Sequence, residues 1–364
     1  MTEHLKLDGV SVLPYEHITK DLEGLHSLNG HVIAYDGNAC NYMLYEAMLK
    51  RHRLNSPALV ARMKAVKNPV EIAGMKCCQF RDGAAVVRYL AWLEKELEKG
   101  DNPELTEYTG AEVLERLRSE GEYFVGLSFA TISSTGPNGS IIHYKPEKET
   151  ARVLTNKEVY LLDSGGQYLD GTTDTTRTVH YTEPTAFQRE AYTRVLLGNL
   201  DLERLVWPAN VGYSGGEIDM IARRSLWQAG LNFGHGTGHG VGQYLNVHEG
   251  PQGINRFKNE PLVAGMDITD EPGYYLDGEF GIRIENLLFI KEHEKFEGYL
   301  CFENITWAPY CRNLMDFSIL KQEDIDYINE YHKKVEAALT PYLEKYDDQV
   351  ALAYLKRECA HIEP

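Results

Sequence analysis

Apolar residues recur every three or four positions in several stretches of the chain, and this spacing predicts amphipathic helices. The clearest helix begins at Asn68, a good N-cap that is followed by Pro69 and Glu71 in the first turn. We expect it to end near Gly100, with an apolar face made of Val86, Leu90, Leu93 and Leu97. Further helices are predicted at 41–51, after a cap formed by Thr109 and Glu112, at 187–206, after a cap formed by Ser214 and Glu217, and at 324–339.

Apolar and β-branched runs bounded by turn residues predict strands. They occur at 32–35, 123–129 and 159–162. A longer pattern, DEPGYYLDGEFGIRIENLLFI at 270–290, has Asp277-Gly278 at its centre and predicts a β-hairpin. The pattern therefore predicts a chain in which helices and strands are mixed.

Residues 1–65 have too few elements to form a core of their own. They offer one short strand, one helix and a polar link at 53–57. Small groups of elements like this one are not stable alone. We therefore expect the segment either to pack on the rest of the chain or to be the end of a larger domain.

Composition narrows the class of protein. The 364 residues, 43% of them hydrophobic, are enough for one large core or two domains. A formal net charge of −17 argues against nucleic-acid binding. The chain has no run of about 18 apolar residues and no signal-like N-terminus, so we expect no membrane association and a cytoplasmic location. The cysteines form no CxxC pair, and we interpret the adjacent Cys77 and Cys78 as packing residues.

The stretch LLDSGGQYLDGTTDTTRT, at 161–178, carries the first candidate chemistry. Asp163 ends an apolar strand, a Gly-rich turn follows, and Asp174 comes eleven positions later. Buried carboxylates that lie close together repel each other unless a cation or a proton compensates them. Taken alone, the two acids also fit ordinary turn and cap positions.

Glu271 and Glu285 lie symmetrically about Gly278 in the predicted hairpin, so we expect them to face each other across its two strands. Like charges placed opposite each other destabilise a strand pair, and they too require a counter-charge. His239 adds a nitrogen donor from a Gly-rich segment whose backbone can approach other strands closely.

Together, these side chains would make one nitrogen and several oxygen ligands, enough for two divalent cations: Asp163, Asp174, His239, Glu271 and Glu285. Such a set suits Mn²⁺, Co²⁺, Fe²⁺ or Zn²⁺, and the sequence alone does not rank them. Two-metal sites activate a water and polarise a carbonyl, which is the chemistry of hydrolysis. We expect Arg283 to share the strand face of Glu285 and to orient that carboxylate, or else simply to pair with a nearby acid.

Four motifs of the chain resemble those of the pita-bread metallopeptidases of family M24, and most closely those of its cytosolic Xaa-Pro aminopeptidases. They are TDTTRT (173–178), HGTGHGVGQYLNVHEGP (235–251), DEPGYY (270–275) and GIRIEN (281–286). The resemblance implies an α+β pita-bread fold, with a curved antiparallel sheet flanked by helices and a partial α/β segment before it. It implies that residues 1–65 are the end of a second, creatinase-like N-terminal domain, with the first absent. Residues 66–364 would form the catalytic domain and a C-terminal extension.

The resemblance also implies a site and an activity. It places Asp163, Asp174, His239, Glu271 and Glu285 at the five ligand positions of a dinuclear, manganese-binding centre. It implies substrate binding by His143, His235, His239 and His248, and catalysis by His143, His248 and Glu271. The expected reaction releases the N-terminal residue from peptides with proline in second position, through a metal-bridged hydroxide. The expected partners are such peptides and a second copy of the chain in a homodimer.

Two other hypotheses stay open. One is a different hydrolase of the same fold, either a prolidase-like dipeptidase or a methionine aminopeptidase. The other is a non-catalytic module that binds a partner. The C-terminal tail and the GYYLDGEFGIRIEN run favour the aminopeptidase, and the intact ligand positions favour an enzyme over a binding module. His143 and His235 also fit purely structural roles.

Overall fold

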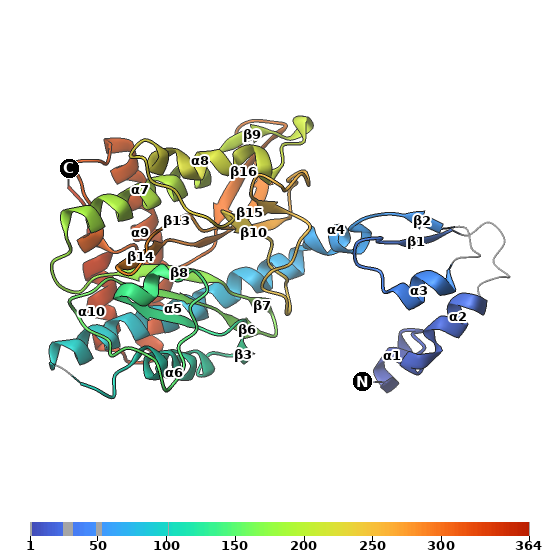
Figure 1. Ribbon diagram of the computed structural model, residues 1–364, viewed down its shortest axis with the longest axis horizontal. Helices are drawn as coiled ribbons and strands as arrows, with labels where there is room; N and C mark the ends of the chain where they lie inside the picture. The colour runs from blue at the N-terminus through green and yellow to red at the C-terminus, as the bar shows by residue number, and fades with distance from the viewer. Residues whose placement is uncertain (1, 25–31, 49–52, 101, 364) are drawn as a thin grey trace. The chain divides into compact units, whose positions relative to one another are not determined.

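The computed structural model describes residues 2–24, 32–48, 53–100 and 102–363, and the chain divides into two compact units, Met1–Met63 and Lys64–Pro364 (Figure 1). The smaller unit contains short elements that bury little. In order, these are α1 (Thr2–Leu7), a 3₁₀ turn (Tyr15–His17), α2 (Ile18–Gly24), β1 (Ile33–Tyr35), α3 (Tyr42–Ala47), β2 (Arg53–Asn55) and α4 (Leu59–Ala65), whose last residues belong to the larger unit.

Two predictions for the smaller unit need comment. The strand expected at 32–35 is confirmed as β1, but the polar link expected at 53–57 is wrong in part. Residues 53–55 instead form β2, which pairs in parallel with β1. The helix expected at 41–51 is confirmed as α3 at its start, where the Asn41 side chain accepts a hydrogen bond from the Met43 N–H; residues 49–51 lie outside the described residues.

The larger unit has six long helices among its described residues. They are α5 (Pro69–Glu98), α6 (Glu107–Ser119), α7 (Ala186–Glu203), α8 (Gly215–Trp227), α9 (Gln322–Lys345) and α10 (Gln349–Glu358). The caps of α5 and α8 are those expected from Asn68 with Glu71 and from Ser214 with Glu217. The cap expected at Thr109 is wrong, because Thr106 caps α6 and Thr109 occupies its N3 position.

The strands of the larger unit form small sheets, and every strand pair among its described residues is antiparallel. One sheet has the order β4 (Ile132–Thr135), β5 (Tyr160–Ser164), β8 (Thr175–Val179), and another has β12 (Asp267–Asp270), β15 (Asn286–Glu292), β16 (Tyr299–Asn304), β9 (Val206–Pro208). The remaining strands are β3 (Phe124–Leu127) with β6 (Gly166–Tyr168) and β7 (Gly171–Thr172), β10 (Gly238–His239) with β11 (Gly253–Ile254), and β13 (Gly273–Leu276) with β14 (Phe280–Arg283).

Helices cover the strands on two sides. In Figure 1, α7 and α8 lie on one side of the strand layer, and α5 and α6 lie on the other. The predicted apolar faces of α5 and α9 enter the same core; their buried residues include Val86, Leu90, Leu93, Leu97, Ile325, Ile328, Val335 and Leu339. This arrangement is the expected α+β pita-bread fold. Among the described residues, no helix is both long and apolar enough to cross a membrane.

Cysteine packing is only partly as expected. Cys78 is buried in α5, whereas Cys77 is exposed, because adjacent helical positions face different directions; both are free thiols.

The helix expected at 187–206 ends at Glu203, and Val206 begins β9 instead.

Candidate metal centre

Asp163 and Asp174 lie at the ends of two paired strands. Asp163 is the fourth residue of β5 and pairs in register with Thr176 of β8, and Asp174 immediately precedes β8. The short strands β6 and β7 fold back between them. The turn therefore brings two carboxylates that are eleven residues apart to the same end of one sheet.

Glu271 and Glu285 face each other, as the hairpin predicts. The ladder that pairs Asp270 with Asn286 and the ladder that pairs Gly273 with Arg283 have the same register, so the two glutamates lie opposite each other in the gap between them. In this gap the backbone N–H groups of the two glutamates bond to segments outside the hairpin. The Glu271 N–H donates to the Thr237 carbonyl at 2.8 Å, and the Glu285 N–H donates to the Thr176 carbonyl at 3.1 Å.

The second of these bonds joins the two carboxylate pairs. Thr176 belongs to β8, so the Glu285 segment is tied directly to the sheet that carries Asp163 and Asp174. The Thr176 hydroxyl also donates to Glu285 Oε2 at 2.7 Å.

His239 reaches the acids from the Gly-rich segment, as expected. A Cβ atom at Gly238 would lie 1.8 Å from the Thr269 carbonyl oxygen, so only glycine allows β10 to approach β12 this closely. The His239 N–H then donates to the Thr269 hydroxyl at 3.0 Å. The absence of a side chain at position 238 thus sets the position of the neighbouring imidazole.

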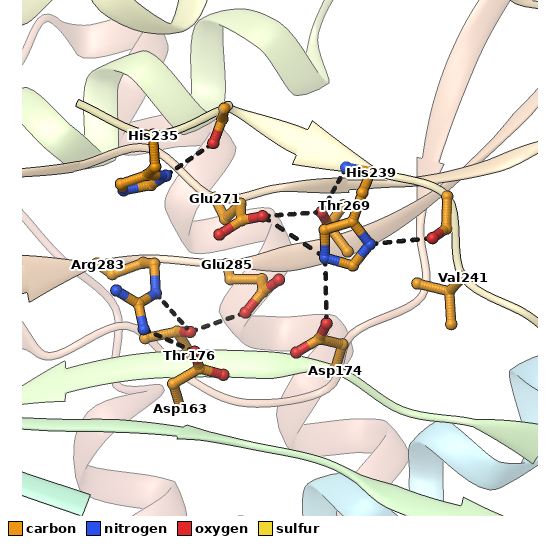
Figure 2. A network of polar contacts seen from close by, with 12 residues as sticks. Asp163, Asp174, Thr176, His235, His239, Val241, Thr269, Glu271, Arg283 and Glu285 are labelled. Carbon is orange, nitrogen blue, oxygen red and sulfur yellow. Dashed lines mark hydrogen bonds and ion pairs between the residues drawn. The ribbon is translucent and has the colours of Figure 1, made fainter. Parts of the chain in front are cut away.

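These five side chains converge on one place (Figure 2). His239 Nε2 lies 3.4 Å from Asp174 Oδ2 and 3.6 Å from Glu271 Oε1. In each of two sets of residues, the ligand atoms all lie within 4.8 Å of one another. One set is His239, Glu271 and Glu285, and the other is Asp163, Asp174 and Glu285, so Glu285 belongs to both. A third such set contains Asp174, His239 and His248.

The charges of the site require compensation. Burial, followed by the nearby charge of Asp174, raises the pKa of Glu285 well above its usual value. Burial also raises the pKa of Glu271, to about 7, and that of Asp174. Asp163 Oδ1 is buried and has no hydrogen-bond partner among the residues that the structure describes. Four acids with a free oxygen among them fit a pair of divalent cations, with Glu285 shared between the two ligand sets.

His239 is oriented for ligation. Its Nδ1 lies 2.9 Å from the Gly240 carbonyl and donates to it, which leaves Nε2 to face the acids. Burial lowers the pKa of this imidazole, but the hydrogen bond with Asp174 and the charge of Glu271 outweigh burial and raise it to about 9. Without a cation, the ring therefore holds a proton where a metal ion would bind.

Arg283 does not orient Glu285 directly, and that prediction is wrong. Its guanidinium lies 2.6 Å from Asp163 Oδ2, and it donates to the Tyr275 hydroxyl at 2.6 Å. The side chain belongs to β14, and the carboxylate within its reach is the one at the end of β5. Arg283 pairs with an acid, which was the alternative interpretation, and that acid is one of the five candidate ligands.

The other three candidate histidines differ in what they can do. His235 has both nitrogens engaged, Nδ1 at 2.7 Å from the Gly236 carbonyl and Nε2 at 2.8 Å from the Tyr275 hydroxyl. Burial lowers its pKa to about 3, so the ring is neutral and has no free polar atom for a substrate. His248 packs edge-on against His239, with ring centroids 4.2 Å apart, and is exposed. His143 is exposed as well.

A pocket of about 620 Å³ opens over the five acidic and imidazole groups. All eight candidate residues line it. Its other walls include apolar side chains, a lysine and the paired arginine: Phe129, Ala130, Ile132, Ile142, Val247, Lys145 and Arg283. The site is thus an anionic floor beneath a partly apolar cleft.

Sequence reasoning missed a buried ion pair behind this site. Lys67 Nζ lies 2.9 Å from Asp267 Oδ1, and both side chains are at most 1% exposed. The lysine also donates to the Val241 carbonyl at 2.7 Å, and Asp267 accepts from the Val241 N–H at 3.0 Å. The pair therefore fixes the backbone two residues after His239. Position 267 carried a signal, because a charged residue at a core-facing position of a strand usually has a partner.

Comparison with known proteins identifies the family of these motifs. Residues 73–292 match metallopeptidase family M24, residues 298–362 match the C-terminal region of that peptidase family, and residues 1–71 match the creatinase/prolidase N-terminal domain. A probable Xaa-Pro aminopeptidase P of Leptosphaeria maculans is 52% identical over 309 residues, which are 83% of this chain and 50% of that protein. One of Laccaria bicolor is 44% identical over 99% of this chain and 57% of its own length.

Solved structures of Xaa-Pro peptidases are also similar to this chain. The X-prolyl aminopeptidase of Caenorhabditis elegans, described as a cytosolic enzyme with a di-nuclear active site, has a TM-score of 0.92 and 37% identity, covering 99% of this chain and 59% of that one. The Xaa-Pro dipeptidase of Bacillus anthracis has a TM-score of 0.63 and 25% identity, covering 80% of this chain and 77% of that one. The chain thus spans about half the length of the curated relatives it matches.

Proposed function

The chain belongs to metallopeptidase family M24, and from this we propose that it is a metal-dependent aminopeptidase that releases the N-terminal residue from peptides with proline in second position. The observation that carries the proposal is the pair of ligand sets that share Glu285 at the floor of a 620 Å³ pocket. The names of its relatives supply the substrate class.

Two divalent ions, which we propose to be Mn²⁺, would be held by one set of residues around His239 and Glu271 and another around Asp163 and Asp174, with Glu285 shared. Mn²⁺ suits carboxylate oxygens and accepts one imidazole. When bound, such ions polarise a carbonyl and lower the pKa of a bound water.

Glu271 is the proposed proton acceptor. Its carboxylate lies in the floor of the pocket, where it can take up the proton that the attacking water loses. His143 and His248 are exposed in the same pocket, and within the described parts of the chain neither ring is held by two hydrogen bonds as His235 is. We assign to them the hydrogen bonds to the substrate and to the oxygen that gains charge.

Proline selection follows from shape. The nitrogen of proline carries no hydrogen, so the enzyme cannot recognise this bond through its amide N–H. The apolar side chains of Phe129, Ile142 and Val247 line the pocket and would accept a pyrrolidine ring, while the anionic floor attracts the free amine of the substrate.

His235 and Arg283 act on the site indirectly. Tyr275 lies between them and is hydrogen-bonded to both. A series of hydrogen bonds therefore runs from His235 through Tyr275 and Arg283 to Asp163. These residues fix the direction of a ligand carboxylate. For His235 we therefore propose a positioning role in place of a direct hydrogen bond to the substrate.

Release of the N-terminal residue from Xaa-Pro-Xaa tripeptides, compared with cleavage of Xaa-Pro dipeptides, tests the proposal. The proposal predicts tripeptide cleavage. Cleavage of dipeptides alone would favour the prolidase-like alternative, for which the likeness to the Bacillus anthracis dipeptidase is the supporting observation. Cleavage only after N-terminal methionine would favour a methionine aminopeptidase.

A folded chain that binds no transition metal would favour the non-catalytic binding module.

We further propose that residues 1–65 correspond to the end of a second, creatinase-like N-terminal domain, that residues 66–364 form the catalytic domain, and that the protein acts in the cytoplasm as a homodimer. The matched N-terminal domain supports the first of these points, and the cytosolic enzyme of Caenorhabditis elegans supports the proposed location.

A further inference from the structure

The wall of the pocket carries one positively charged side chain, Lys145, that has no role in the proposed mechanism. Among the lining residues, only Lys145 and Arg283 are permanently charged cations, and Arg283 is paired with Asp163. Lys145 is exposed, and no ion pair or hydrogen bond within the described parts of the chain engages its ammonium group. Among the described residues that line it, the pocket therefore has an anionic floor and one cation, Lys145, without a partner.

The backbone at Lys145 is held in place from both sides. On one side, the Tyr144 hydroxyl donates to Glu107 Oε2 at 2.7 Å, and on the other the buried Pro146 restricts Lys145 to extended conformations. Glu107 is fully buried on α6 and holds the segment 135–152 at several points. Its carboxylate also accepts hydrogen bonds from the Thr135 N–H, the Asn138 amide and the Arg152 N–H. A fixed backbone keeps the lysine beside the pocket, while its long side chain remains free to reach a ligand.

We propose that Lys145 is a specificity-determining residue that binds the C-terminal carboxylate of short peptide substrates, an inference that rests on the proposed peptidase function. A peptide places its free amine and its carboxylate at opposite ends. The acids of the floor attract the amine and Lys145 attracts the carboxylate, so a short zwitterionic peptide matches both charges within one pocket. Long or C-terminally amidated peptides lack the second match.

Hydrolysis of Ala-Pro-Ala and of its C-terminal amide tests this inference on the metal-loaded chain. The wild type should favour the free acid by about threefold to fivefold in kcat/KM, the size expected of a solvent-exposed ion pair. The preference should lie in KM, because the carboxylate is remote from the bond that breaks. Lys145→Met should abolish it, and Lys145→Arg should keep it.

Lys148 provides the matched control. It is exposed on the same loop but does not line the pocket, so Lys148→Met should leave the preference unchanged. An equal preference in the wild type and in Lys145→Met, or none in the wild type, would overturn the inference.

A binding experiment separates this inference from the proposed function. Calorimetric titration of the metal-loaded chain with the product Pro-Ala, and with Pro-Ala-amide, requires no turnover. Tighter binding of the free acid that disappears in Lys145→Met supports the role of Lys145, even if no peptide is hydrolysed. Hydrolysis of both tripeptides without any difference in product binding would leave the proposed function standing and refute the role of Lys145.

Discussion

The acids of the site should make the metal-free chain less stable as the pH rises. Glu271 has a pKa of about 7 in the folded chain, against an ordinary value of 4.5 for a glutamate side chain in water. Because the folded-state value is the higher one, protonation of Glu271 stabilises the fold. That stabilisation is fully present below about pH 4.5 and is lost as the pH rises through about 7.

The size of the effect follows from this difference in pKa. A difference of 2.5 units corresponds to about 3 kcal/mol in the free energy of unfolding. The larger unit has about 300 residues, and at about 2.1 cal/mol/K per residue this free energy corresponds to about 5 °C in Tm. The imidazole of His239, whose pKa is raised from 6.5 to about 9, contributes in the same direction at higher pH.

Thermal unfolding with excess chelator, from about pH 5 to about pH 8, measures this loss. Mn²⁺ should reverse the trend, because its ligands must lose protons to bind it and its stabilisation therefore grows with pH. Glu271→Gln removes the titrating group and should flatten the profile of the metal-free chain by about 5 °C. Glu279→Gln, at an exposed position of the same hairpin, should not. A metal-free wild type whose Tm stays level or rises over this range would refute the reasoning.

Three further predictions concern single side chains. Asp174→Asn and Glu285→Gln should each lower the bound metal from two ions per chain and abolish turnover, while circular dichroism shows a folded chain; retained turnover would count against the ligand assignment. Glu271→Ala should reduce kcat/KM more than His143→Ala, because it removes both a ligand and the proton acceptor, and the reverse order would show that the roles are misassigned. Lys67→Met should destabilise the chain by about 3–5 kcal/mol in urea unfolding, because it leaves the buried Asp267 unpaired. Replacing Asp267 with Leu as well should restore part of that loss, and no recovery would show that the pair is not the cause.

The parts of the site that depend on local sequence were predictable. The register of a hairpin follows from its turn, so the symmetry of Glu271 and Glu285 about Gly278 was enough to place them face to face. The need for close approach at Gly238 could likewise be inferred from the Gly-rich run around His239.

Contacts between distant segments were not predictable in the same way. Lys67 and Asp267 are 200 positions apart, and nothing local to either shows that they meet. Arg283 shares a strand with the residues before Glu285, yet its partner is Asp163 from the other sheet. The α6 cap was wrong because both Thr106 and Thr109 suit a cap, and the choice between them depends on where the helix packs.

The most direct test of the central claim is the release of the N-terminal alanine from Ala-Pro-Ala before chelation, after chelation and after Mn²⁺ is added back. We predict that turnover is lost with the chelator and returns as two ions bind per chain. Turnover that continues undiminished in excess chelator would contradict the account.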